Sequence, residues 1–374
     1  MGRFRSQPVG LDIDQGALKA VQISSAGGDY TLRHVGYRRL PPGTVTEGEV
    51  ADHDLLASEI AEFWESHGFK GKSAVLGLSN QRVVVRLLDF PHMEPGDLES
   101  AIGFEAQDHI PMPLNEAVLD YVVLGPQEEG SDLDRILIVA AQKDMVSRFT
   151  SVAFTAGIRP VGVDVKALSL MRSTLPQSLF DEGATLLLDV GSEITNLVVS
   201  QGGSPTLTRF IIGGANQFSQ TIAEVAGIEE EDAEKHLMSP QVRIGDVPED
   251  ENQELEASEP DEDAPEDDLD PALMFDIRRG LEDSVQVMAE DVQRSVEYHY
   301  SQPGAQEVSQ VFVSGEGALV AGLESYVSEL LGMTAHRANP LQKFAANRSN
   351  VSDEQLQVME PVLAVAIGLA IEEA

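Results

Sequence analysis

Two stretches of the chain repeat a pattern that can bind phosphate. Residues 10–21 read GLDIDQGALKAV, and residues 187–198 read LLDVGSEITNLV. In each stretch an apolar strand runs into an Asp, Asp12 or Asp189, and a tight turn then leads to a second apolar strand. An Asp at this point can hold a hydrated cation, while the backbone N–H groups of the turn point at anionic oxygens. Two such turns facing each other would clamp a phosphate chain, although a single turn of this kind is common without any ligand.

The candidate ligand-binding residues lie in these two stretches and just after them. They are Asp12, Gln15, Gly16 and Lys19 in the first, Asp189, Gly191, Ser192 and Thr195 in the second, and Gly213 and Gly214 before a predicted helix. Asp12 and Asp189 would hold a metal ion through water. Two interpretations stay open. Lys19 is either a phosphate ligand or a surface residue, and the two glycines either admit a phosphate or sugar to the helix start or only form a turn.

No residue stands out as a catalytic group. Glu193 lies beside the second turn, but a solvated side chain at a hairpin tip is the favoured interpretation. The 8 His residues lack the spacing of a metal site, and the sequence contains neither a nucleophile elbow nor a Walker loop. We therefore assign no catalytic residue from the sequence.

Length and composition limit the class of protein. With 374 residues, the chain is long enough for two or more lobes with sizeable cores. It has no Cys, which excludes disulfides and thiolate metal sites. No stretch approaches the roughly 18 consecutive apolar residues of a membrane span, and the N-terminus lacks the apolar segment of a signal peptide. We expect a cytoplasmic protein.

The charge argues against nucleic acid as a partner. The formal net charge is −38, whereas a phosphate backbone is bound by clustered Lys and Arg. Residues 246–270 alone contain 14 acidic residues and no basic residue, with three prolines and few large apolar side chains. Such a segment buries too little apolar surface to offset the entropy lost on ordering, so we expect a disordered loop there.

Hydrophobic periodicity divides the first half of the chain into two predicted units. The first unit has strands at 8–14, 17–24, 30–40 and 73–78 and an amphipathic helix at 54–67. The second unit has strands at 82–89, 117–124, 134–141 and 158–164 and helices at 95–109 and 143–156. Its β-α-β-β-α-β order predicts a small layered unit inserted in the larger one.

The second half of the chain begins with the repeated hairpin. A strand at 206–212 and helices at 215–226 and 229–238 are predicted after it, and a long helix at 271–300 follows the acidic segment. A strand at 308–314, a Ser-Gly-Glu-Gly turn at 314–317 and helices at 319–331 and 360–372 complete the prediction. The intervening segments predict no further element.

The order of these features resembles the actin-like ATPase superfamily, which includes actin, sugar kinases, heat-shock chaperones and bacterial FtsA. The shared features are two Asp hairpins, a Gly-Gly helix start and a Ser-Gly-x-Gly turn after a late strand. Residues 104–121, reading FEAQDHIPMPLNEAVLDY, narrow the resemblance to the PilM family of cytoplasmic, actin-like proteins of type IV pilus assembly. Residues 209–220, 338–340 and 366–370 resemble the same family, and the resemblance runs from about residue 8 to residue 370.

The resemblance implies an α/β, two-lobed actin-like ATPase (ribonuclease H-like) fold with an inserted small α+β subdomain of the FtsA and PilM type. Residues 8–81 and 165–184 would form the first lobe, 82–164 the inserted subdomain, 185–215 and 305–374 the core of the second lobe, and 216–304 its outer subdomain with the acidic loop at 246–270. Type II secretion relatives carry a transmembrane helix after the cytoplasmic region. This chain ends without one, which favours the pilus family.

Proteins of this superfamily hold ATP or ADP with Mg²⁺ between the two hairpins and an adenosine turn. The resemblance adds Gly315 and Gly317 of that turn to the candidate site. Three positions depart from the family pattern: Asp14 replaces a usual Gly, Leu237 stands where many relatives have a Lys, and Glu316 replaces the second Gly of the adenosine turn. A second carboxylate in the first turn repels phosphate, and the other two changes remove nucleotide contacts. We therefore expect weak nucleotide binding or none, and negligible hydrolysis.

Two functions follow from the resemblance. The first is a scaffold of the pilus machine that binds the cytoplasmic tail of a PilN-type inner-membrane protein, and other pilus assembly proteins, and is peripheral to the membrane through that partner. The second is an enzyme of the same fold, an active ATPase or a small-molecule kinase. A kinase needs an acidic base in a substrate pocket, and the sequence does not show one.

We expect the partner tail to dock as an extended peptide between the first lobe and residues 82–164. The strands there offer apolar side chains and edge backbone groups for peptide capture. The candidate contact residues are Val83, Val85, Leu87, Val118, Tyr121 and Val123. An acidic rim would favour a basic residue on the tail. The alternative is that the helices at 95–109 and 143–156 cover these strands completely.

Overall fold

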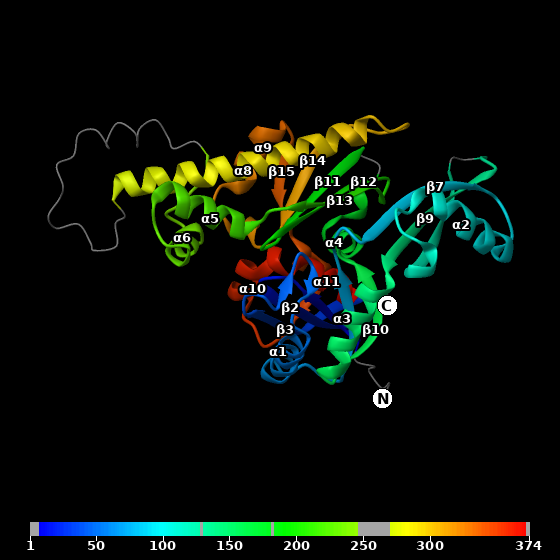
Figure 1. Cartoon of the computed structure of the whole chain (residues 1–374), viewed down its shortest axis with the longest axis horizontal. Coiled ribbons are helices and arrows are strands. Elements are labelled where there is room, and N and C mark those ends of the chain that lie inside the picture. The colour runs from blue at the N-terminus through cyan, green and yellow to red at the C-terminus, as the bar shows by residue number, and fades with distance from the viewer. Residues whose placement is uncertain (1–6, 128–129, 181–182, 246–269, 372–374) are drawn as a thin grey trace.

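The computed structural model describes residues 7–127, 130–180, 183–245 and 270–371. Two large sheets lie one above the other in Figure 1, and a small third sheet extends to the side. We name the six-stranded sheet with its helices the first lobe, and the five-stranded sheet with its helices the second lobe. The acidic loop predicted at 246–270 lies outside the described residues except for Asp270, whose side chain caps the following helix.

The first lobe is built on six strands in the order β10-β6-β1-β2-β3-β16. Their bounds are β1 Val9–Ile13, β2 Ala17–Ala26, β3 Asp29–Arg39, β6 Ser73–Leu78, β10 Arg159–Val165 and β16 Phe344–Asn347. A small hairpin, β4 Val45–Thr46 with β5 Glu49–Val50, follows β3. Strands β1 and β2 pair antiparallel, whereas β1 and β6 pair in parallel. All five residues of β1 are buried, because helices cover both faces of the sheet.

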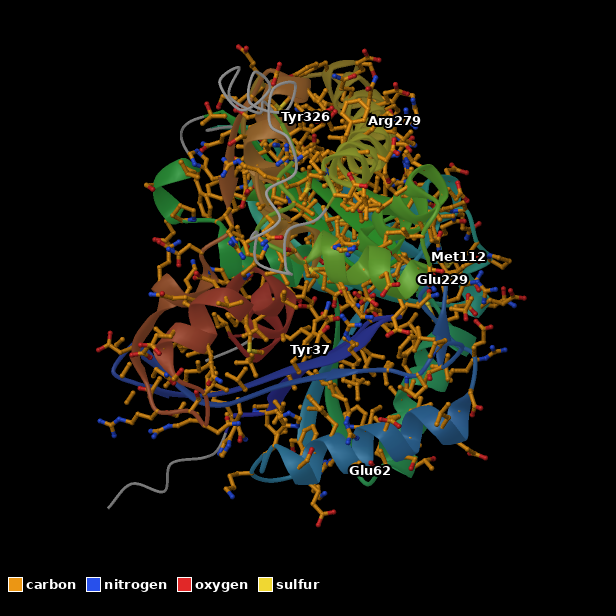
Figure 2. The ribbon with its side chains drawn as sticks, turned by 90° about the vertical axis from the view of Figure 1, so that its left-hand side faces the viewer. Tyr37, Glu62, Met112, Glu229, Arg279 and Tyr326 are labelled. Atoms are coloured by element: carbon orange, nitrogen blue, oxygen red, sulfur yellow. The ribbon has the colours of Figure 1, made fainter. Side chains whose placement is uncertain are left out.

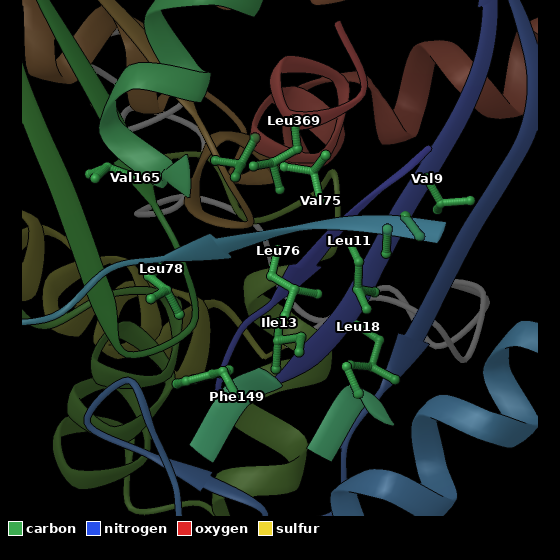
Figure 3. Close-up of a cluster of buried hydrophobic side chains, with 14 of the residues drawn as sticks. Val9, Leu11, Ile13, Leu18, Val75, Leu76, Leu78, Phe149, Val165 and Leu369 are labelled. Atoms are coloured by element: carbon green, nitrogen blue, oxygen red, sulfur yellow. The ribbon is translucent and has the colours of Figure 1, made fainter. Parts of the chain in front are cut away.

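Helices α1 His53–Ser66 and α3 Lys143–Thr155 contact each other and pack on one side of this sheet. Helices α4 Lys166–Thr174 and α11 Ala364–Ile371 form a second contacting pair, and Figure 1 shows them on the side that faces the second lobe. The buried side chains of the sheet, including Leu11, Ile13 and Leu76, belong to one apolar cluster with Phe149 of α3, part of which is drawn in Figure 3. This core fixes the position of the first hairpin.

The second lobe is built on five strands in the order β13-β12-β11-β14-β15. Their bounds are β11 Ala184–Val190, β12 Ile194–Gln201, β13 Ser204–Ile212, β14 Val308–Ser314 and β15 Thr334–Arg337. Four helices pack with them: α5 Ala215–Ala226, α6 Glu230–Leu237, α8 Pro271–Tyr300 and α9 Leu323–Leu331. Helix α8 runs along the top of the lobe in Figure 1, and its apolar stripe is buried as its periodicity predicts.

The third sheet has the order β7-β9-β8, with β7 Val83–Pro91, β8 Ala117–Pro126 and β9 Leu133–Gln142. Helix α2 Pro95–His109 packs on one face of it. The predicted β-α-β-β-α-β order is confirmed, but its last two elements do not belong to the small sheet, because α3 contacts α1 and β10 pairs in parallel with β6 in the first lobe. Periodicity detects a strand but does not specify its partner strand. The domain bounds given above stay a prediction.

Several short elements were not predicted from the sequence. They are β4, β5, β15, β16, α4 and α10 Asp353–Met359, together with 3₁₀ turns at Leu114–Glu116, Gln177–Leu179, Gly317–Leu319 and Pro340–Lys343. Helix α9 begins at Leu323 rather than 319, and the predicted closing helix begins as a 3₁₀ turn, Glu360–Leu363, before α11. Most of these elements are too short to show a full hydrophobic period.

Within the described residues, one helical stretch, Asp353–Ile371, is long and apolar enough to cross a membrane by length and composition alone. However, 67% of its most apolar window is buried inside the protein. Its last part, α11, contacts β1, β2 and α4. The buried helices of soluble proteins are often as long and as apolar as this stretch, and we interpret it as part of the core.

Candidate functional site

The two repeated hairpins have matching strand registers. In the first hairpin Asp12 pairs with Lys19 across β1 and β2, and in the second Asp189 pairs with Asn196 across β11 and β12. All four side chains are buried. The two Asp residues therefore occupy equivalent positions at the ends of their strands, as the sequence repeat predicts.

The turns of the two hairpins touch at the boundary between the lobes. A Cβ added at Gly16 would lie 2.3 Å from Ser192 Oγ, and one added at Gly191 would lie 2.9 Å from Asp14 Oδ2. Each glycine thus allows a close approach of the opposite turn. The structure therefore brings together the residues of the two stretches that were predicted to clamp a phosphate. The two turns, however, are in direct contact with each other.

Lys19 is a buried residue, with 3% of its side chain exposed. Of the two interpretations of Lys19 left open by the sequence, a surface residue is therefore wrong. Lys19 Nζ donates a 3.1 Å hydrogen bond to Asp14 Oδ2 and lies 3.4 Å from Glu316 Oε1 and 3.9 Å from Asp12 Oδ2. Burial by itself lowers the pKa of Lys19, but these carboxylates raise the pKa well above its usual range. The charge of Lys19 is engaged by the protein's own acids.

Lys166 is a functional-site residue that the sequence analysis missed. It belongs with Lys19, Asp12, Asp14 and Glu316 to one group of charged side chains, which we name the hairpin cluster. Lys166 Nζ lies 2.7 Å from Asp12 Oδ1 and donates a 2.8 Å hydrogen bond to the carbonyl of Ile13. Burial lowers the pKa of Lys166, but Asp12 and Asp14 more than offset this, so the pKa is raised. The sequence signal that could have indicated Lys166 is a charged residue at the start of an apolar segment. That segment is α4, a helix that the sequence analysis did not predict.

The unusual Asp14 is compensated by these lysines. Burial alone would raise the pKa of its carboxyl group, but Lys19, Lys166 and the N–H of Gln15 together hold the pKa below its usual range. Asp14 is therefore ionised at neutral pH. The repulsion expected from a second carboxylate in this turn is offset by protein cations.

Asp189 has a different environment. It accepts hydrogen bonds of 2.9 Å from Ser314 Oγ and 3.2 Å from Asn196 Nδ2, and no Lys, Arg or His nitrogen of the described residues lies within 4 Å of its carboxylate. Burial raises the pKa of Asp189 to about 6, and the negative charges of Asp12 and Asp14 add to this against the opposing effect of Lys19. Asp189 is therefore mostly ionised at neutral pH and becomes neutral as the pH falls below about 6.

We expect Asp189→Asn to stabilise the protein at pH 8 and to lose this effect at pH 5. The folded state binds the Asp189 proton more tightly than the unfolded chain, so stability falls as pH rises between the usual carboxyl value and about 6. The ionisation cost is roughly 3 kcal/mol at about 1.4 kcal/mol per pKa unit. After the loss of one hydrogen bond, a gain of about 1 to 2 kcal/mol should remain. Urea unfolding at both pH values measures it, and an equal gain at both would contradict the assignment.

Glu316 of the late turn reaches into the hairpin cluster. Its Oε2 accepts a short hydrogen bond from Ser192 Oγ, and its Oε1 faces Lys19. The flanking glycines pack against the end of β11: a Cβ at Gly315 would lie 2.4 Å from the carbonyl oxygen of Val190, and one at Gly317 would lie 2.4 Å from Val190 Cγ1. These two glycines thus serve a close packing contact.

The helix start at Gly213 and Gly214 is closed to a ligand. The first two N–H groups of α5, on Ala215 and Asn216, donate to the carbonyls of Gly191 and Ser192. A Cβ at Gly214 would lie 2.2 Å from the Gly191 carbonyl oxygen. Of the two open interpretations, the strand-to-helix turn fits the structure, because the N–H groups that would bind phosphate already have partners.

The remaining sequence-predicted ligands also bind within the protein. Gln15 Oε1 accepts a 2.8 Å hydrogen bond from the N–H of Glu47, and Thr195 Oγ1 donates a 2.8 Å hydrogen bond to the carbonyl of Gly213. Glu193 is half-buried, which raises its pKa, and it is hydrogen-bonded to Asn216. Glu193 also lines a cavity together with Glu47, Arg82 and Phe210.

A further ion pair crosses the boundary between the lobes. Arg39 at the end of β3 contacts Glu234 of α6 across it. In Figure 2, Tyr37 lies on the first lobe's side of this boundary and Glu229, which precedes α6, lies on the second lobe's side. Leu237, the position where many relatives have a Lys, is buried in the core of the second lobe and does not face the boundary.

The candidate peptide-contact residues divide into two groups. Val83 and Val85 of β7 are buried in the core of the first lobe, so they are not available to a docked peptide, and Leu87 is half-buried against the same core together with Phe210 of β13. Tyr121 of β8 packs partly against the core under α2. Of the six candidates, Val118 and Val123 of β8 are exposed, and Val122 and Leu124, which the sequence analysis did not select, are exposed beside them.

A sequence profile described as "Type IV pilus assembly protein PilM" matches residues 10–257 and 268–374. The chain belongs to this family. It is also similar to a solved structure described as "PilM-PilN type IV pilus biogenesis complex", with 26% identity, coverage of 98% of both chains and a TM-score of 0.79. The PilM resemblance expected from residues 104–121 is therefore confirmed.

More distant structures share the fold of this PilM family member. The ethanolamine utilization protein EutJ from Carboxydothermus hydrogenoformans has 14% identity, a TM-score of 0.55 and coverage of 99% of this chain and 90% of that chain. MreB5 of Spiroplasma citri, bound to ADP, has 12% identity, a TM-score of 0.53 and coverage of 98% and 96%. The predicted two-lobed, actin-like α/β fold is confirmed.

Proposed function

We propose that this PilM family member is a cytoplasmic scaffold of the type IV pilus inner-membrane complex. It binds the cytoplasmic tail of a PilN-type inner-membrane protein as an extended peptide along β8, and it is held at the membrane through that partner and other pilus assembly proteins. The observation that carries this proposal is the apolar, exposed edge strand β8. The family and the similarity to a PilM-PilN complex support the choice of partner.

Strand β8 has the properties of a peptide-capture edge. It is the last strand of the three-stranded sheet, so one side of its backbone lies outside the ladder. The N–H of Tyr121 donates a 2.8 Å hydrogen bond to the side chain of its neighbour Asp120. Val118 and Val122 lie on the face opposite α2, because they pair with Ala141 and Leu137 of β9. An added strand would cover these side chains and use the free backbone groups.

A second exposed apolar edge lies on the first lobe. Strand β10 is the outer strand of the six-stranded sheet, and Val161 and Val163 on it are exposed. Phe154 at the end of α3 is exposed as well. These residues belong to the segment that connects the small sheet to the first lobe, where the sequence analysis places the peptide. The strongly acidic chain favours a basic residue on the tail.

We also propose that ATP or ADP with Mg²⁺ binds weakly or not at all. In support, Lys19 and Lys166, the lysines of the hairpin cluster, are engaged by internal carboxylates, and the N–H groups at the α5 start are used by the second turn. The alternative of an active ATPase or a small-molecule kinase is less favoured, because the carboxylates of Asp12, Asp14 and Glu316 are engaged by Lys19, Lys166 and Ser192 inside the protein.

Val122→Asp should weaken binding of a synthetic tail peptide by at least about tenfold. Val122 is 56% exposed, so the variant should fold, while a charge would replace apolar contact worth roughly 1.5 to 3 kcal/mol at the interface. Fluorescence anisotropy with a labelled peptide of the PilN-type tail measures the affinity. The matched control is Val287→Asp on α8, which introduces the same charge at a side chain that is 62% exposed in the second lobe.

The proposal predicts that the control binds like the unchanged protein. If neither the unchanged protein nor the control binds peptide at tens of micromolar, the partner is wrong. If Val122→Asp and Val287→Asp bind the peptide equally well, the PilN-type partner is still supported, but β8 is not the strand at which the peptide docks. Thermal melts of all three proteins verify that the variants are folded.

A further inference from the structure

We propose that Glu316 is a specificity-determining residue: its carboxylate occupies the phosphate position between the two hairpins and keeps the lobes closed without a nucleotide. The inference rests on the weak nucleotide binding proposed above, and it identifies the Glu316 carboxylate as the cause of that weak binding. From the sequence, Glu316 is expected only to disturb the adenosine turn. Its side chain instead lies in the hairpin cluster.

The Glu316 carboxylate bridges the two side chains that would bind a phosphate. Oε2 accepts a hydrogen bond from Ser192 Oγ in the second turn. Oε1 lies 3.4 Å from Lys19 Nζ in the first hairpin and accepts no hydrogen bond from the described residues. A carboxylate presents two anionic oxygens to these donors as a phosphate would. Glu316 thus joins the second lobe to the first through the candidate phosphate ligands.

The backbone around Glu316 holds the side chain in this place. Strand β14 pairs in parallel with β11, which sets Ser314 beside Asp189. The next residue, Gly315, has a φ of +82°, and its N–H donates a 2.9 Å hydrogen bond to the carbonyl of Pro361. A residue with a Cβ would be strained at this φ and would collide with Val190. The turn therefore directs Glu316 toward the hairpins.

The charges of the cluster leave no place for a phosphate while Glu316 is present. Lys19 and Lys166 face four carboxylates, those of Asp12, Asp14, Asp189 and Glu316. A nucleotide would add further negative charge to a buried cluster that already has an excess of acids. In Glu316→Ala, one negative charge is lost and Ser192 Oγ is released. Lys19 keeps its 3.1 Å hydrogen bond to Asp14, so it is not left as an unpaired buried charge.

Calorimetric titration with Mg-ATP tests the occupancy. The Glu316→Ala variant should bind at least about tenfold more tightly than the unchanged protein, because one or two charge-assisted hydrogen bonds to phosphate become available. The matched control is Glu234→Gln. It removes the other acid of the second lobe that contacts a first-lobe cation, Arg39, but that pair lies outside the hairpin cluster. The control should bind Mg-ATP as weakly as the unchanged protein.

A distance measurement tests the closure. The chain has no Cys, so spin labels at Glu62→Cys and Arg279→Cys are the only two thiol attachment points. Both positions are exposed, and Figure 2 shows them at opposite ends of the molecule, on α1 and α8. The unchanged protein should give one narrow distance distribution with or without Mg-ATP. The Glu316→Ala variant should give a longer or broader distribution that Mg-ATP narrows.

The outcomes separate this inference from the proposed function. If the unchanged protein binds Mg-ATP at low micromolar concentration, the weak nucleotide binding is wrong and the role of Glu316 fails with it. If the unchanged protein binds weakly and Glu316→Ala shows neither tighter binding nor a changed distance, the role of Glu316 alone is overturned. Peptide binding at β8 is measured separately and is independent of either result.

Discussion

Lys166→Met is expected to lower the free energy of unfolding by about 3 to 5 kcal/mol, the usual cost of removing one partner of a buried ion pair. Lys166 Nζ lies 2.7 Å from Asp12 Oδ1, and both side chains are buried. Without it, the nearest cation to Asp12 is Lys19 at 3.9 Å, which is already shared with Asp14 and Glu316. Met preserves the length of the side chain, so the loss reflects charge more than packing.

Urea unfolding at pH 7.5 measures this loss. The double variant Asp12→Asn with Lys166→Met should recover part of it, because the buried carboxylate left without a close cation is then removed. The matched control is Lys235→Met, which removes a solvent-exposed lysine paired with Glu231 and Asp232 on α6. Its effect should be much smaller, since exposed ion pairs contribute little. Equal losses for the two lysine variants would contradict the structural role of the cluster.

Gly368→Ala is expected to destabilise the protein by about 3 kcal/mol or more, and to reduce the soluble yield. Helix α11 crosses α4 so closely that a Cβ at Gly368 would lie 1.9 Å from the carbonyl oxygen of Ser169. Both sides of this contact are backbone, so a side-chain rotation cannot relieve the overlap. The helices would have to separate, and α11 packs directly on β1, the strand that leads to the first hairpin.

The control for this variant is Gly103→Ala in α2. Nothing lies within 4 Å of a Cβ added there, so the helix should gain about 0.5 to 1 kcal/mol from the better propensity of Ala. The two substitutions are chemically identical and both lie in helices. Thermal or urea unfolding should therefore shift in opposite directions, and a mild effect at Gly368 would mean that α11 and α4 are not as closely packed as described.

The limits of sequence-based prediction are clear at the edge strands. Periodicity predicted both β7 and β8 as apolar strands, and the same candidate status was given to Val83 and Val118. In the structure Val83 is buried by the first lobe and Val118 is exposed. The difference arises because β13 and the first-lobe core cover β7, and that contact involves residues far away in the chain.

Elements that are controlled by local chemistry can be predicted from the amino-acid sequence alone. The apolar spacing of residues 271–300 determines the long helix α8, and the Asp-turn repeat determines two hairpins of equal register, with Asp12 and Asp189 at matching positions. The stretch at 104–121 was enough to indicate the family. Such features depend on neighbours within a few residues, so one chain segment contains the whole signal.

Which charged side chains contact each other depends on how the chain folds in three dimensions. Lys166 comes from α4, Glu316 from the turn after β14, and both converge on the hairpin of Lys19. Their positions follow from the parallel pairing of β10 with β6 and of β14 with β11, which brings distant segments to one edge. The strength of each ion pair then depends on burial, since charges interact far more strongly away from water. Neither strand partner nor burial can be read from the spacing of charged residues along the chain.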